Sequence, residues 1–224
     1  MDWKIIAILI LLFLSGFAIS LAAYVIGVFH IDIEVAVALI GGHNPVLDAI
    51  MAAVSFLGDR FVPVILVATV AAICAVKKKW VDTVFVALTL ISSAAIAGTL
   101  KAIIGRPRPP GFSLDPYDLF QPFNQYSYPS GHVLFFVIFF GFSGFLAWNY
   151  LTGWKRWLSL ITCISLITLI GPSRIYLGEH WISDVIGSYI IGTFFLIILI
   201  LLYMLTESRN VKILKNMGNG TGKI

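Results

Sequence analysis

The sequence predicts an all-α protein: an integral membrane bundle of six transmembrane helices with one additional short interfacial helix. Two observations support this fold class. Of the 224 residues, 59% are hydrophobic and only 12% are charged, whereas soluble domains are about half apolar and about a quarter charged. The hydrophobic residues are also gathered into long runs that short polar stretches separate.

Six segments approach the roughly 20 apolar residues that cross a bilayer. They are Ile5–Phe29, Phe61–Val76, Val81–Leu100, Val133–Leu151, Trp157–Gly171 and Val185–Leu205. The first is longer than the apolar part of a signal peptide and lacks a clear cleavage site, so we expect it to be retained. The second and fifth are short, and we expect them to extend into their flanks.

A shorter helix is expected between the first two spans. Asn44 and Pro45 have the pattern of an N-cap and a first helical residue, and Gly58 is typical of a stop. This segment cannot cross the bilayer, so we expect it to lie along the interface. No internal repeat divides the chain, which predicts one domain over residues 1–206 and a basic cytoplasmic tail over 207–224.

The basic residues indicate the orientation. If the six spans alternate, 10 of the 15 bases fall on one side: Lys4, Lys77, Lys78, Lys79, Lys155, Arg156, Arg209, Lys212, Lys215 and Lys223. The positive-inside rule then predicts that both termini are cytoplasmic. The remaining bases and the main polar clusters converge on the outer face.

The stretch from Gly171 to Asp184 carries four ionisable residues between two apolar segments. Such residues in a membrane protein indicate function, because they are costly unless paired. His180 and Asp184 are four residues apart, which on a helix places them one turn apart. A carboxylate there can accept a hydrogen bond from one imidazole nitrogen and leave the other as a base or nucleophile. We expect Ser173 to be a cap.

A second cluster follows the third span, with Lys101, Arg106 and Arg108 beside a proline turn. Each arginine precedes a proline, which restricts its backbone to extended conformations. A lone base here would simply reach toward lipid headgroups. Three bases beside a rigid turn indicate an anion site instead.

A third cluster, Pro129–His132, opens the fourth span. Ser130 and Gly131 at a helix start offer a hydroxyl and backbone N–H groups to an anion, and His132 can exchange a proton beside it. An ordinary cap with a hydrogen-bonded histidine is equally compatible with this motif taken alone.

Metal binding is the rival chemistry, with ligands from His132, His180, Glu179 and Asp184. Three nearby bases would repel a cation and attract phosphate, so we expect neither a metal nor another cofactor. The net charge of +4 does not indicate nucleic-acid binding, because the bases are dispersed along the chain. Cys74 and Cys163 lie in different apolar runs and are expected to be free thiols.

The three clusters together resemble the type-2 phosphatidic acid phosphatase superfamily, the lipid phosphate phosphatases. Its first motif is met by Lys101, six residues, then Arg108-Pro109. Its second is met by Pro129–His132, and its third by Ser173-Arg174, His180 and Asp184 at the family spacing. The motifs extend from Lys101 to Asp184.

The resemblance implies that His180 is the nucleophile and forms a phosphohistidine, with Asp184 orienting it. His132 would be the general acid and then the base that activates water. The phosphoryl oxygens would be held by Lys101, Arg108, Arg174, Ser130 and the Gly131 N–H. The family works without a metal. Arg106 lies outside the motif and is expected behind the site or at a headgroup. Ser173 is also expected behind the site, and Glu179 either tunes the protonation of His180 or is an exposed loop acid.

Other polar and aromatic residues are expected to have lesser roles. His30 and His43 are interpreted as loop residues, and Asp59-Arg60 as a local pair. Between the first two motifs, aromatic residues form an interfacial belt or line the path of a lipid tail: Phe112, Tyr117, Phe120, Phe123, Tyr126 and Tyr128.

The expected activity is hydrolysis of a lipid phosphate or pyrophosphate at the outer face of the cytoplasmic membrane. Polyprenyl diphosphate, phosphatidate and phosphatidylglycerophosphate types are candidates. A transporter that binds phosphate without cleaving it, and a phosphotransferase to an acceptor other than water, remain open. The sequence does not indicate an oligomeric state.

Overall fold

The computed structural model describes residues 2–39, 44–110 and 125–220, and within these ranges every regular element is a helix. The helices are α1 (Trp3–Ile26), α2 (His30–Leu39), α3 (Pro45–Phe56), α4 (Val62–Val76), α5 (Trp80–Ile104), α7 (Gly131–Tyr150), α8 (Gly153–Tyr176) and α9 (Ile182–Gly220). The predicted all-helical class is therefore confirmed.

Five of the described helices are long and apolar enough to cross a membrane: α1, α5, α7, α8 and α9. The predicted second span forms α4, which has 15 residues and remains below that length. It does not extend beyond the predicted segment, because Pro63 lies at its start and Lys77–Lys79 follow its end. The predicted fifth span does extend at both ends, and it forms the 24-residue α8 with Pro172 inside it.

The short helix predicted after Asn44 is α3. The Asn44 side chain accepts hydrogen bonds from the N–H groups of Val46 and Leu47, at 2.9 and 3.3 Å, and Pro45 is the first helical residue. The prediction missed α2, which begins at His30, so His30 is helical rather than part of a loop. The Asp32 carboxylate accepts the N–H of Phe29 at 3.0 Å and stabilises this start.

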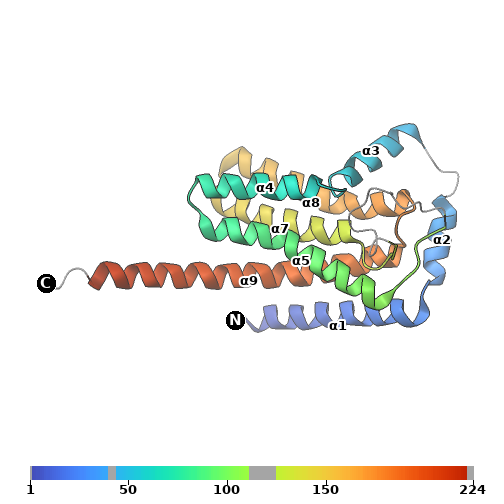
Figure 1. Ribbon diagram of the computed structural model, residues 1–224, viewed down its shortest axis with the longest axis horizontal. Coiled ribbons are helices and arrows are strands. Elements are labelled where there is room, and N and C mark those ends of the chain that lie inside the picture. Colours follow the sequence, from blue (N-terminus) through green and yellow to red (C-terminus); the bar gives the residue numbers. More distant parts are fainter. Residues whose placement is uncertain (1, 40–43, 111–124, 221–224) are drawn as a thin grey trace.

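The core is centred on α7, which packs against α5, α8 and α9 (Figure 1). Its phenylalanines Phe136, Phe139 and Phe142 are almost fully buried. By contrast, α1 lies on the outside of the bundle along α9, and most of its apolar side chains are exposed. The exposed apolar surface of α1 is consistent with contact to lipid.

The polar motifs gather at one end of the bundle, where α5 ends, α7 begins, α8 ends and α9 begins. The first residues of α1 and the last residues of α9 lie toward the opposite end (Figure 1). The helix α9 also continues to Gly220, beyond the predicted end of the last span. His43 and the aromatic residues 112–123 of the loop lie outside the described residues.

Candidate active site

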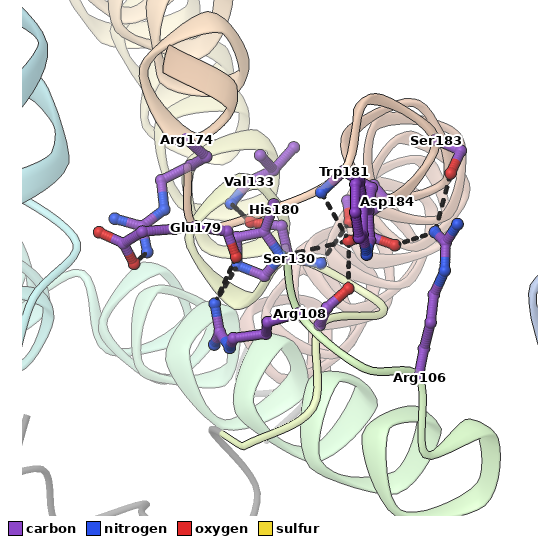
Figure 2. Close-up of polar contacts among 12 residues, drawn as sticks. Arg106, Arg108, Ser130, Val133, Arg174, Glu179, His180, Trp181, Ser183 and Asp184 are labelled. Carbon is purple, nitrogen blue, oxygen red and sulfur yellow. Dashed lines mark hydrogen bonds and ion pairs between the residues drawn. The ribbon is translucent and has the colours of Figure 1, made fainter. Parts of the chain in front are cut away.

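The first motif lies where α5 ends. Lys101 is in the last turn of this helix and is 3% exposed, and Gly105 ends the helix in the left-handed conformation at φ 62°. The chain then turns back across the end of the bundle. Arg108 donates from Nη1 to the carbonyl of Glu179 at 2.6 Å, and the same atom lies 3.4 Å from His180 Nε2. The first and third motifs are therefore in direct contact (Figure 2).

The second motif forms the N-terminus of α7. The Ser130 side chain caps the helix and accepts from the Val133 N–H at 3.5 Å, while the Ser130 N–H donates to Ser188 Oγ of α9 at 2.8 Å. Gly131 is the first helical residue and His132 the second. The positive end of the α7 dipole thus lies in the polar cluster, where it favours an anion.

His180 lies in the loop between α8 and α9, not on a helix as its spacing to Asp184 predicted. Only Asp184 is helical, in the first turn of α9, and its carboxylate accepts the Trp181 N–H at 2.9 Å. That bond begins the helix after His180. His180 is 3% exposed, and its Nδ1 lies 3.6 Å from Asp184 Oδ2, beyond hydrogen-bond distance. Among the described residues, Nδ1 has no hydrogen-bond partner.

Burial lowers the pKa of His180 well below its ordinary value, and nearby positive charges lower it further. The charges are those of Arg108, Arg174 and Lys101, followed by His132. The imidazole is therefore neutral at physiological pH and can act as a nucleophile.

Asp184 is held by other partners. Arg106 Nη1 and Ser127 Oγ donate to its two carboxylate oxygens, in addition to the Trp181 N–H. Arg106 is 1% exposed and also pairs with Asp32 of α2, while its Nε donates to the Gly27 carbonyl at 2.6 Å. Arg106 thus lies on the side of Asp184 away from His180 (Figure 2). Its contacts with Gly27 and Asp32 join Asp184 to the segment after α1.

Arg174, in the last turn of α8, is 2% exposed and pairs with Glu179 and with Ser55 of α3. Its Nε has no hydrogen-bond partner among the described residues. Ser173 does not cap a helix as expected. It lies inside α8, and its hydroxyl donates to the Met51 carbonyl of α3 at 2.7 Å.

His132 pairs with Asp59, at 2.7 Å from Nε2 to Oδ1. Burial alone would raise the pKa of Asp59, but the hydrogen bond and charge of His132, with the charges of Arg174 and Arg60, lower it below the ordinary value. The expected local pair of Asp59 with Arg60 is therefore not its main contact. Asp59 lies in the turn between α3 and α4, outside all three motifs.

Several of the residues around this site were not identified from the sequence. They are Asp32, Ser55, Asp59, Ser127, Ser183 and Ser188. The one usable signal was Asp32, an acid in an apolar segment, which in a membrane protein indicates a buried partner. Within the described ranges, no three His, Cys, Asp or Glu side chains are placed to hold a metal ion.

Comparison with known proteins places the chain in a family. A family model described as the PAP2 superfamily matches residues 82–207. Phosphatidylglycerophosphatase B of Bacillus subtilis is 25% identical over 83% of this chain and 91% of its own length. An undecaprenyl-diphosphatase of Sulfolobus acidocaldarius is 32% identical over 48% of this chain, and that match spans half the length of the archaeal protein.

A solved structure has the same fold. It is the crystal structure of a transmembrane PAP2 type phosphatidylglycerolphosphate phosphatase from Bacillus subtilis, with a TM-score of 0.74 and 22% identity. The superposition covers 90% of this chain and 96% of that one. The chain therefore belongs to the PAP2 superfamily, and it is a lipid phosphatase.

Proposed function

We propose that this protein hydrolyses a lipid phosphate or diphosphate through a phosphohistidine formed on His180. The observation that carries the proposal is the environment of His180: a buried imidazole with a lowered pKa, surrounded by the charges of Arg108, Arg174 and Lys101. A neutral nitrogen beside fixed positive charges can attack phosphorus while the charges stabilise the phosphoryl oxygens.

In the first step, His180 Nε2 attacks phosphorus, and the bond from phosphorus to the leaving oxygen breaks. His132 gives its proton to that oxygen. In the second step, His132 takes a proton from water, the water oxygen attacks phosphorus, and the bond to Nε2 breaks. Because the phosphorylated ring is positively charged, the nearby Asp184 carboxylate stabilises it electrostatically across the 3.6 Å separation.

The phosphoryl oxygens would be bound by Lys101, Arg108, Arg174, the Ser130 hydroxyl and the Gly131 N–H. The proposal requires Arg174 to exchange Glu179 for the substrate. The unpartnered Nε of Arg174 and the helix start at Gly131 support this assignment, because both offer N–H groups that an anion would satisfy. Arg106 would not touch phosphate, since its guanidinium is already bound by two carboxylates.

We infer that the substrate is a polyprenyl diphosphate or a phosphatidylglycerophosphate-type lipid, in keeping with the names of the two relatives. We favour polyprenyl diphosphate by analogy within the family, because recycling of a carrier lipid at the outer face would fit the orientation proposed for the site. The proposed outer-face location rests on alternation of six spans, with α4 counted as one, which assigns 10 of the 15 bases to the side of the termini. The mechanism uses no metal.

A substrate panel with the purified protein in detergent micelles tests the proposal. We expect phosphate release from a polyprenyl diphosphate, a phosphatidylglycerophosphate or both, with His180→Ala inactive but folded. Vanadate should inhibit and EDTA should not. Near-normal hydrolysis by His180→Ala would contradict the mechanism. Binding of phosphate without release would favour a transporter, and a phosphorylated acceptor other than water would favour a phosphotransferase.

A further inference from the structure

Each of the two histidines assigned to the reaction has its own carboxylate. His180 faces Asp184 within the third motif. His132 meets Asp59, which comes from the turn between α3 and α4, 73 residues earlier in the chain. The His132–Asp59 contact, at 2.7 Å, is the closer of the two pairs. The family motifs do not account for this contact.

The backbone beside Asp59 fixes the position of the His132 ring. Gly58 lies against the imidazole so closely that a Cβ at this position would come within 2.2 Å of His132 Cδ2 and 2.9 Å of Nε2. Any larger residue at position 58 would displace the ring. The turn thus holds the imidazole from two sides, by packing at Gly58 and by hydrogen bonding at Asp59.

The lowered pKa of Asp59 keeps it ionised near neutral pH, so it can only accept a hydrogen bond. His132 Nε2 must therefore carry a proton, which leaves Nδ1 as the nitrogen that exchanges a proton with the substrate. Other charged groups also act on His132. Burial disfavours its protonated form, as do Arg174 and His180, whereas Asp59 and Glu179 favour it. Of these, Asp59 makes the hydrogen bond.

We propose that Asp59 is a positioning residue of the reaction, which orients His132 and stabilises its protonated form against the positive charge of Arg174. The inference rests on the proposed function, because it requires His132 to exchange a proton with the phosphate ester. In the first step, the Nδ1–H proton passes to the leaving oxygen as the P–O bond breaks. In the second, Nδ1 takes a proton from the attacking water, and Asp59 keeps its hydrogen bond to Nε2 throughout.

The leaving group supplies the first test. Farnesyl monophosphate must release an alkoxide, which needs a proton, whereas farnesyl diphosphate releases a phosphate ester that needs little help. Asp59→Asn in the purified full-length protein should therefore lower kcat for the monophosphate about 10- to 100-fold, part of the roughly 10²- to 10⁴-fold that a general acid supplies. The decrease in kcat for the diphosphate should be smaller, and KM should stay nearly unchanged for both substrates.

The pH profile supplies a second readout. Asp59→Asn should move the alkaline limb of kcat/KM to lower pH, since His132 then loses its proton more readily, and Asp59→Glu should restore part of the activity. Asp48→Asn is the matched control, because Asp48 lies on the neighbouring helix α3 and its carboxylate accepts a hydrogen bond from the Tyr176 hydroxyl. Asp48→Asn should leave kcat for both substrates, and the position of the alkaline limb, as in the wild type. If Asp59→Asn lowered kcat equally for the two substrates and left the alkaline limb at its wild-type pH, the inference would be overturned.

A measurement without substrate separates this inference from the proposed function. The chain has only four histidines, so each imidazole signal in a ¹³C-histidine NMR titration can be assigned by single substitutions. The His132 signal should titrate at lower pH in Asp59→Asn than in the wild type. An unchanged His132 titration would overturn the inference even if the wild type hydrolyses lipid phosphates. An inactive wild type with the shifted titration would instead contradict the proposed function and leave only the effect of Asp59 on the pKa of His132.

Discussion

Arg106 and Asp184 form an ion pair in which both side chains are completely inaccessible to solvent. Asp32 of α2 forms a second ion pair with the same guanidinium. The three residues connect the segment after α1 to the start of α9, next to His180. The loop that carries His180 is therefore supported by α2, which lies outside residues 82–207, the part of the chain that the family model matches.

Replacing Arg106 with Met should destabilise the protein strongly, because it leaves two buried carboxylates without their partner. Breaking a buried ion pair by removing one member costs about 3–5 kcal/mol. We expect a large drop in the thermal unfolding midpoint in detergent, together with loss of activity. Glu34→Gln is the control on α2, since Glu34 pairs with His30 at the exposed surface, and it should unfold like the wild type. Equal unfolding midpoints for all three proteins would refute this role of Arg106.

Replacing Glu179 with Gln should increase the affinity for vanadate. In the present structure the Glu179 carboxylate pairs with Arg174, which the proposed mechanism assigns to the phosphoryl oxygens. Removing this competing charge should lower the inhibition constant for vanadate about five-fold, equivalent to the roughly 1 kcal/mol of a partly exposed ion pair. The measurement is vanadate inhibition of phosphate release, with Glu207→Gln near the far end of α9 as the control. Weaker inhibition in Glu179→Gln would show that Glu179 supports anion binding.

The protein should keep most of its hydrolytic activity in mildly acidic solution. Burial and the charges of Arg108, Arg174 and Lys101 hold the pKa of His180 well below its ordinary 6.5. A nucleophile with a lowered pKa stays unprotonated until the pH falls through that lowered value. The acidic limb of kcat/KM should therefore lie below pH 6.5.

Removing one of the charges should reverse part of this effect. Lys101→Gln should lower activity and also move the acidic limb to higher pH, because the protonated form of His180 is then less disfavoured. Lys155→Gln is the control, because Lys155 lies at the start of α8, and it should leave the acidic limb of kcat/KM at its wild-type pH. An acidic limb that does not move in Lys101→Gln would indicate that Lys101 does not act on His180.

The sequence was sufficient to predict the helices whose signals are local. Asn44 and Pro45 start α3 as expected. Five of the six predicted spans form long helices, and three of these, α1, α5 and α7, lie close to their expected bounds. The motif residues Lys101, His132 and His180 were also predicted to meet, and the structure brings them to one end of the bundle. These features depend on composition and short-range spacing.

The contacts between distant segments could not be predicted in this way. Asp59 was interpreted as a partner of its neighbour Arg60, because nothing near it in the sequence points to His132. Arg106 was expected behind the site, but its pairing with Asp32 depends on how α2 folds back over α9. The spacing of His180 and Asp184 suggested one helix, whereas the Asp184 carboxylate begins α9 only after His180. Each difference arises from tertiary contacts that leave no periodic signal.

The central claim is that His180 becomes covalently phosphorylated. The most direct measurement is a rapid-quench reaction with a lipid diphosphate that carries ³²P in its terminal phosphate, followed by peptide mapping at alkaline pH. His132→Ala slows release of the intermediate, and the diphosphate can still phosphorylate His180 because its leaving phosphate ester needs little help from an acid. We expect an acid-labile, base-stable label on the peptide that contains His180, and none in His180→Ala. Turnover by the wild type without any label on His180, or a label that persists in His180→Ala, would contradict it.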